Sequence, residues 1–180
     1  MTGTKDSDYG DGSKDIAGTN YDWGVYNYVM GVKTWRTMTR SEWYYLLNQR
    51  ERASDKRGHA KLRISDNPLK YVSGYVFLPD NYYEPDVTFH INTTGYNNNI
   101  ISLEDWKKME AAGAAFLPAA GYRLSTMQKV DEEGRYWTAS ADGDSFAYSF
   151  DITENSLDPI HFSSTQRHCG ISVRLVQDVK

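Results

Sequence analysis

The most constraining feature of the sequence is a strict two-residue alternation near its carboxyl end, in the segment FAYSFDI (146–152). Successive side chains of a β-strand point to opposite faces, so one face of this strand is predicted to be buried and the other, with Ser149 and Asp151, to face solvent. The segment ISVRLV (171–176) alternates in the same way, and YWTAS (136–140) precedes a polar turn. The last third of the chain is therefore predicted to hold short antiparallel strands.

Two helix starts with the shared pattern T/S-x-x-E/D-W precede these strands, at Thr39 and at Ser102. Thr39 and Glu42 form a predicted capping box, and apolar residues follow each start at helical spacing. Two helices and several short antiparallel strands, with no linker between them, predict a single α+β domain at 21–180. Residues 1–20 contain almost no apolar side chain and are predicted to form a flexible polar lead-in.

The overall composition excludes several classes of protein. The 180 residues suffice for one core, and a formal charge of −4 without a long basic stripe argues against nucleic acid as a partner. A single cysteine excludes an internal disulfide framework and any multi-cysteine zinc site. No apolar run approaches the roughly 20 residues of a membrane span, and the N-terminal residues contain no apolar signal segment.

The dipeptide His168-Cys169 is the only sequence feature that suggests a catalytic nucleophile. Adjacent residues on an extended strand point to opposite faces, so His168 is not expected to activate the Cys169 thiol, and the chain is predicted not to be an enzyme. The four histidines show no paired spacing, so no metal site is predicted. A calcium ion between the acidic loops at 142–158 stays open as an alternative, whereas the segment at 6–15 lacks the closing Glu of a calcium loop.

A binding surface is the remaining interpretation of the carboxyl-terminal third. The chain has 14 Tyr, 5 Trp and 6 Phe beside many small polar residues, a mixture typical of recognition surfaces. By composition alone, a β-rich domain with Tyr in ordinary strands explains the same residues and is the favoured alternative. The small or polar residues around the alternating strands have no evident packing role. The candidate ligand-binding set is Asp142, Asp144, Ser145, Ser149, Asp151, His161, Ser163, Ser164, Gln166, His168 and Cys169.

Several ordered motifs resemble one protein family. They are YDWGVYN (21–27), WRTMTRSEWYYLLNQR (35–50), FLPAAGYR (116–123), YWTAS (136–140) and the ending R-x-x-G-x-SVRLV (167–176). This combination resembles the "major paralogous domain" family of Bacteroidales and their phages, whose fold is the formylglycine-generating-enzyme variant of the C-type lectin fold. It is also similar to the variable proteins of diversity-generating retroelements.

The resemblance implies a C-type-lectin-like domain that displays exchangeable side chains to a protein or glycan ligand on a cell or phage surface. In such proteins, adenine-directed mutagenesis rewrites codons near the carboxyl end, between fixed segments that YWTAS and SVRLV match here. In the family, two tyrosines often stand where this chain has His168 and Cys169, and a single base change converts a Tyr codon into a His or Cys codon. The resemblance therefore implies that Cys169 is an exchanged surface residue. The enzymatic relatives need two active-site cysteines, so an enzyme is the less favoured alternative. A structural subunit of a surface fibre or phage tail also stays open.

Overall fold

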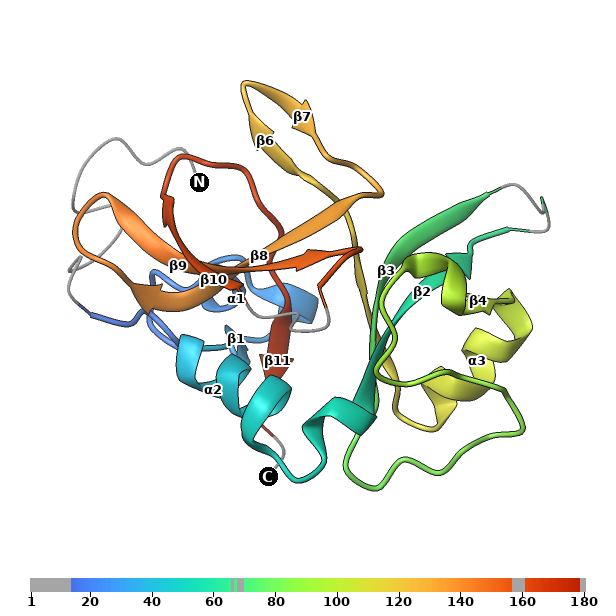
Figure 1. Ribbon diagram of the computed structural model, residues 1–180. Helices are drawn as coiled ribbons and strands as arrows, with labels where there is room; N and C mark the ends of the chain where they lie inside the picture. The colour runs from blue at the N-terminus through green and yellow to red at the C-terminus, as the bar shows by residue number, and fades with distance from the viewer. Residues whose placement is uncertain (1–13, 66, 68–69, 157–160, 179–180) are drawn as a thin grey trace.

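The computed structural model describes residues 14–65, 67, 70–156 and 161–178 and shows a mixed α+β protein with few helices and several short, mostly antiparallel strands (Figure 1). The strands form four small sheets with the orders β1–β11, β10–β9–β8, β4–β2–β3–β5 and β6–β7. The bounds are β1 Trp35–Thr37, β2 Arg57–Arg63, β3 Tyr71–Phe77, β4 Ile100–Ile101, β5 Ala115–Pro118, β6 Tyr122–Leu124, β7 Thr126–Gln128, β8 Glu133–Ala141, β9 Phe146–Thr153, β10 His161–Gln166 and β11 Leu175–Gln177.

The helical segments are short, and several are single turns. The α-helices are α1 Trp23–Tyr26, α2 Arg40–Tyr44 and α3 Leu103–Ala111; α2 continues as a π-helical turn, η3 Tyr45–Gln49. The remaining 3-10 turns are η2 Val29–Gly31, η4 Ala53–Lys56 and η5 Tyr96–Asn98. Both predicted helix starts are confirmed, because Thr39 and Glu42 form a capping box and the Ser102 hydroxyl accepts from the Asp105 amide at 3.1 Å.

Two hydrophobic clusters hold these elements together, one on each face of the four-stranded sheet. In β3, Tyr75 and Phe77 face the first cluster and Val76 faces the second, as strand alternation requires. The first cluster joins α2, η3, β3, β5, β8 and β9 and consists of Trp43, Leu47, Tyr75, Phe77, Leu117, Tyr136, Phe150 and Ile152. The second lies beneath α3 and consists of Ala60, Leu62, Val76, Leu78, Ile101, Trp106, Met109 and Ala114.

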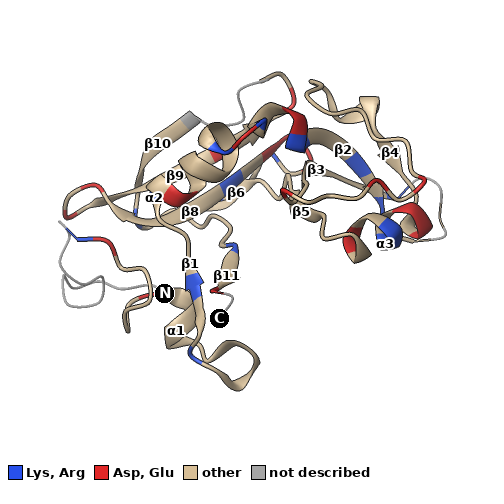
Figure 2. Ribbon diagram, turned by 90° about the horizontal axis from the view of Figure 1, so that it is seen from below, with Lys and Arg blue, Asp and Glu red and all other residues tan. Residues whose placement is uncertain are grey.

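The first and last named strands, β1 and β11, pair in one sheet and lie side by side next to α1 in Figure 2. The predicted strand at 171–176 is only partly confirmed. Residues 171–174 are not in a named strand, and Ser172 bridges instead to Tyr136 of β8. The backbone amide of Trp137 donates to Ser172 at 2.9 Å, so this segment follows β8 before it reaches β1.

The hairpin formed by β6 and β7 projects away from the β10–β9–β8 sheet and from the β4–β2–β3–β5 sheet (Figure 1). Of the predicted lead-in at 1–20, residues 1–13 lie outside the described residues, as does the segment at 6–13 of the weak calcium-loop pattern. The described remainder contacts β8, since the Ile16 amide donates to the Ala139 carbonyl at 2.9 Å. This contact places the start of the described chain beside the carboxyl-terminal strands.

Candidate functional site

A pocket with a volume of about 650 Å³ lies where four segments of the chain converge. Its walls come from the amino-terminal segment, the β6–β7 hairpin, strands β8 and β9, and the turn that follows β10. Pockets of this size are common binding sites for small ligands. The lining residues are Ile16, Tyr21, Trp23, Thr37, Arg123, Leu124, Ser125, Trp137, Thr138, Ala147, Arg167, His168, Cys169, Gly170, Ile171 and Val173.

The amino-terminal wall is fixed by the buried carboxylate of Asp22. Its oxygens accept from the Thr37 amide at 2.9 and 3.1 Å, the Thr37 hydroxyl at 2.9 Å, the Gly24 amide at 3.0 Å and the Gly18 amide at 2.9 Å. A buried carboxylate is tolerated when hydrogen bonds replace its hydration, and here they tie α1 to β1. Tyr21 and Trp23, on either side of Asp22, are each 42% exposed and lie at the pocket.

The turn after β10 is held against the β6–β7 hairpin at Gly170. Its amide and carbonyl exchange hydrogen bonds with the backbone of Arg123 at 3.0 and 2.7 Å. A Cβ at position 170 would lie 3.1 Å from the Cβ of Arg123, which is tighter than ordinary van der Waals contact. Glycine therefore allows the hairpin and the turn to meet and close this side of the pocket.

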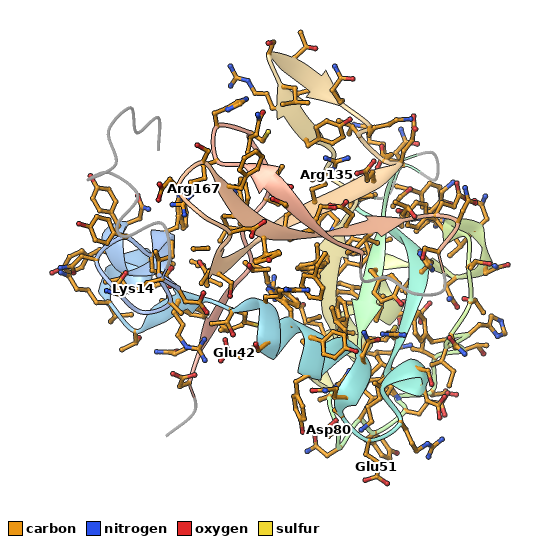
Figure 3. The ribbon with its side chains drawn as sticks, turned by 60° about the vertical axis from the view of Figure 1, so that its left-hand side comes forward. Lys14, Glu42, Glu51, Asp80, Arg135 and Arg167 are labelled. Atoms are coloured by element: carbon orange, nitrogen blue, oxygen red, sulfur yellow. The ribbon has the colours of Figure 1, made fainter. Side chains whose placement is uncertain are left out.

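Arg167 joins the turn after β10 to the β8–β9 hairpin. Its guanidinium donates to the carbonyl of Phe146 at 3.0 Å and to that of Gly143 at 3.1 Å, and its amide donates to Ser145 at 3.1 Å. Figure 3 labels Arg167 beside this part of the sheet and Arg135 toward the opposite end. The strand register agrees, because the residue before Arg167 pairs with Phe146, whereas Arg135 pairs with Asp151.

A second group of polar side chains lies on the β10–β9–β8 sheet, at the end where Arg135 pairs with Asp151. Asp151 accepts from the Ser163 hydroxyl at 3.1 Å, and its other oxygen lies 3.8 Å from Arg135 Nε. Arg135 also pairs with Glu133, and its guanidinium lies 3.9 Å from the Tyr122 ring centroid. Burial lowers the pKa of Arg135, but the hydrogen bond that Arg135 donates to Glu133 and the charge of Asp151 outweigh burial and raise it overall. Arg135 therefore joins Glu133, Asp151 and the Tyr122 ring and orders this face.

The Cys169 thiol is half-buried at the pocket, and its burial raises its pKa above the ordinary thiol value. The neighbouring charge of Arg135 opposes this shift but does not reverse it. Because the thiolate is the nucleophile, a raised pKa makes Cys169 less reactive at neutral pH. Its amide donates to the Gln166 carbonyl at 3.0 Å, which makes it part of a tight turn.

The predicted site residues do not form one surface. Of the set, only His168 and Cys169 line the pocket. Asp142, Asp144 and Ser145 lie in the β8–β9 turn that Arg167 contacts. Ser149, Asp151 and Ser163 share one face of the sheet, whereas Ser164 and Gln166, paired with Tyr148 and Phe146, lie on the other face. The backbone of His161 begins β10, and its side chain lies outside the described residues.

The prediction that Ser149 faces solvent is wrong, because its exposed fraction is 0%. It lies in the central strand of its sheet, opposite Trp137 on one side and Ser163 on the other. Its hydroxyl lies 2.7 Å from that of Thr165, which is also buried. Larger neighbours on the same face therefore enclose this small side chain, although the predicted strand alternation is confirmed.

Sequence reasoning missed most of the pocket walls, including Tyr21, Trp23, Arg123 and Trp137. The aromatic segment at 21–29 contributes little to the core, because only Gly24 and Val25 of α1 are buried. The density of aromatic residues there, beside an N-cap Asp, was the available signal. No local pattern brings Arg123 to Gly170, because that contact depends on the tertiary fold.

No group of three or more His, Cys, Asp or Glu side chains is placed to hold a metal ion within the described part of the chain. The same residues include no helix long and apolar enough to cross a membrane. Comparison of the chain with protein-family models, with curated proteins and with solved structures gives no match.

Proposed function

We propose that this chain is a ligand-binding domain with a C-type-lectin-like fold of the formylglycine-generating-enzyme type, related to the variable proteins of diversity-generating retroelements. Its ligand is a protein or glycan on a cell or phage surface. The observation that carries the proposal is the pocket of about 650 Å³, in which Trp23 and Trp137 meet His168 and Cys169. Exposed aromatic rings and polar side chains on fixed backbone are typical of recognition sites.

The construction of the walls supports recognition rather than catalysis. Asp22 fixes the aromatic wall, and Gly170 fixes the opposite wall, so binding does not require ordering these segments. The thiol that an enzymatic reading would need has a pKa raised by burial. Turn residues at 142–145 and 168–169 are the exchangeable positions of this proposal, whereas buried Ser149 belongs to the scaffold.

The binding role is tested on an array of purified glycans and cell-surface proteins, with Trp23→Ala and Tyr26→Ala as a matched pair. Both residues are exposed aromatic side chains of α1, at 42% and 63%, and only Trp23 lines the pocket. We expect Trp23→Ala to weaken binding of any captured ligand at least about tenfold, while Tyr26→Ala binds as the wild type does. Equal binding by wild type and Trp23→Ala, or no ligand on the array, counts against the proposal.

Diversification by a retroelement is tested separately in the gene. The proposal expects a nearby reverse-transcriptase gene and a near-copy of the codons for 137–176 that differs only at adenines. Substitutions between related loci should then fall at 142–145 and 168–169 and spare the codon of Ser149. Differences spread evenly over all codons would contradict diversification and leave the binding role standing.

A structural subunit of a surface fibre or phage tail is the second candidate, and a specific observation favours it. Tyr26, Tyr28 and Met30 are 63%, 55% and 83% exposed, and Tyr28 and Met30 adopt positive φ angles of 51° and 55°. Large exposed apolar groups held on strained backbone are typical of contact surfaces. Size-exclusion chromatography with light scattering decides between the two candidate functions, because a structural subunit self-assembles without a separate ligand. If the chain is such a subunit, Met30→Ser should abolish its assembly.

A further inference from the structure

The pocket has a charge pattern unlike that of the chain as a whole. The chain carries a formal charge of −4, and Figure 2 shows Lys and Arg scattered among Asp and Glu. The pocket lining within the described residues, in contrast, includes Arg123 and Arg167 and no Asp or Glu. A concave site with guanidinium groups at its surface attracts a negatively charged ligand, and the carboxylate of Asp22 behind its amino-terminal wall is buried and accepts hydrogen bonds from the backbone and Thr37.

Arg123 is the guanidinium best placed to pair with such a ligand. Arg167 already donates to two main-chain carbonyls, at Gly143 and Phe146. The Arg123 side chain is exposed, and within the described residues it makes no hydrogen bond or ion pair. Its backbone is nevertheless fixed by the two hydrogen bonds to Gly170, so the side chain starts from a rigid position. An Arg fork matches the two coplanar oxygens of a carboxylate.

The rest of the lining indicates a ring-shaped ligand with an apolar face. Tyr21, Trp23 and Trp137 contribute flat aromatic surfaces from two separate segments, and Ser125 and Thr138 add hydroxyl groups. Aromatic walls with a few polar groups bind ligands that combine an apolar face with hydrogen-bonding edges. A sugar ring has such a face in its C–H bonds and such edges in its hydroxyl groups.

We infer that the ligand is a glycan that ends in a carboxylated sugar, whose carboxylate pairs with Arg123 while its ring packs on Trp23 and Trp137. This inference rests on the proposed binding function and names the ligand class for the same pocket. A neutral sugar would leave the Arg123 guanidinium without a partner. A mononucleotide would share the aromatic walls, but its phosphate is not the planar acceptor that an Arg fork fits best.

The test compares pairs of sugars that are matched except at the carboxylate, by isothermal titration calorimetry with the full chain. The probes are methyl glucuronide against methyl glucoside, and the methyl glycoside of N-acetylneuraminic acid against its methyl ester. We expect one carboxylated probe to bind at least about tenfold more tightly than its neutral counterpart. In Arg123→Gln this preference should vanish while weak binding of both probes remains.

Lys107→Gln is the matched charge control, because Lys107 is an exposed residue of α3 outside the pocket. It removes one positive charge as Arg123→Gln does and should keep the full preference. Equal affinity of wild type for charged and neutral probes overturns the inference and leaves a sugar-binding function intact. The inference is also overturned if none of the sugar probes binds, or if adenosine monophosphate binds more tightly than they do. The proposed binding function is then decided separately, by the array with the Trp23 and Tyr26 variants.

Discussion

The guanidinium of Arg36 donates to both carboxylate oxygens of Glu42, at 2.9 and 2.7 Å, and so joins β1 to the first turn of α2. The same guanidinium donates to Asp178, at 3.2 and 2.8 Å, just beyond β11. Glu42 also closes the capping box by accepting from the Thr39 amide at 2.8 Å. Arg36 therefore links β1 and the residue after β11 to α2, the helix that packs on the first hydrophobic cluster.

This cluster predicts a loss of stability in acid. Burial raises the pKa of Glu42, but hydrogen bonds from Arg36 and Thr39 outweigh burial, so its pKa lies below 4.5 overall. The hydrogen bond from Arg36 likewise lowers the pKa of Asp178 below 3.8. A carboxyl with a lowered folded pKa stabilises the protein above its unfolded pKa, and this contribution is lost as the pH falls through the folded value.

Glu42→Gln isolates the ion pair, because glutamine at this position preserves the capping-box geometry. In urea unfolding at neutral pH, Glu42→Gln should be less stable than the wild type, and the difference should shrink at pH values below the folded pKa. Glu104→Gln, an exposed charge on α3, is the control and should show no comparable difference. A Glu42→Gln deficit that is the same at neutral and acid pH would contradict the role of the ion pair.

Removing the Asp22 carboxylate is predicted to release the aromatic wall of the pocket. Asp22→Ala leaves the buried Thr37 hydroxyl and amide and the Gly24 amide without their shared acceptor. We expect a cost of about 2–4 kcal/mol in the free energy of unfolding, because charged hydrogen bonds in a buried site are lost together. Chemical denaturation measures the cost, and a loss below about 1 kcal/mol would show that Asp22 is not the anchor.

The sequence was informative where local chemistry decides the structure. The helix starts at Thr39 and Ser102 follow from hydrogen bonds within four residues, and the burial of Phe150 and Ile152 follows from strand alternation. The candidate site was harder to predict, because exposure depends on neighbouring strands. The alternation places Ser149 on the non-core face, but it does not reveal that Trp137 lies opposite it.

The same limit applies to the serine pair within β10. Ser163 and Ser164 are equally polar and adjacent, yet they lie on opposite faces of one strand. Polar composition alone cannot separate them, because both faces of β10 carry polar residues. The pocket itself depends on contacts such as Arg123 with Gly170, far apart in the chain, which no local period encodes.

The enclosed position of Ser149 predicts that it cannot be exchanged freely. Ser149→Tyr must fit a large ring where the exposed fraction is 0%, so we expect a loss of several kcal/mol or failure to fold. Ser164→Tyr places the same ring on an exposed position of the neighbouring strand and should change the melting temperature little. Thermal unfolding of both variants checks the contrast, and equal tolerance at the two positions would restore Ser149 to the exchangeable set.

The Cys169 thiol is predicted to alkylate slowly, and more slowly still when the pocket is filled. Burial raises its pKa above 9.0, so the reactive thiolate is scarcer at a given pH than in an unstructured peptide. Labelling with iodoacetamide at pH 8, followed by mass spectrometry, should give a slower rate for the folded chain than for the chain in urea. Any ligand bound between Trp23 and Cys169 should slow the rate further, whereas in Trp23→Ala the ligand should protect less. Faster labelling in the folded state would show an activated thiol and would revive the catalytic interpretation of His168 and Cys169.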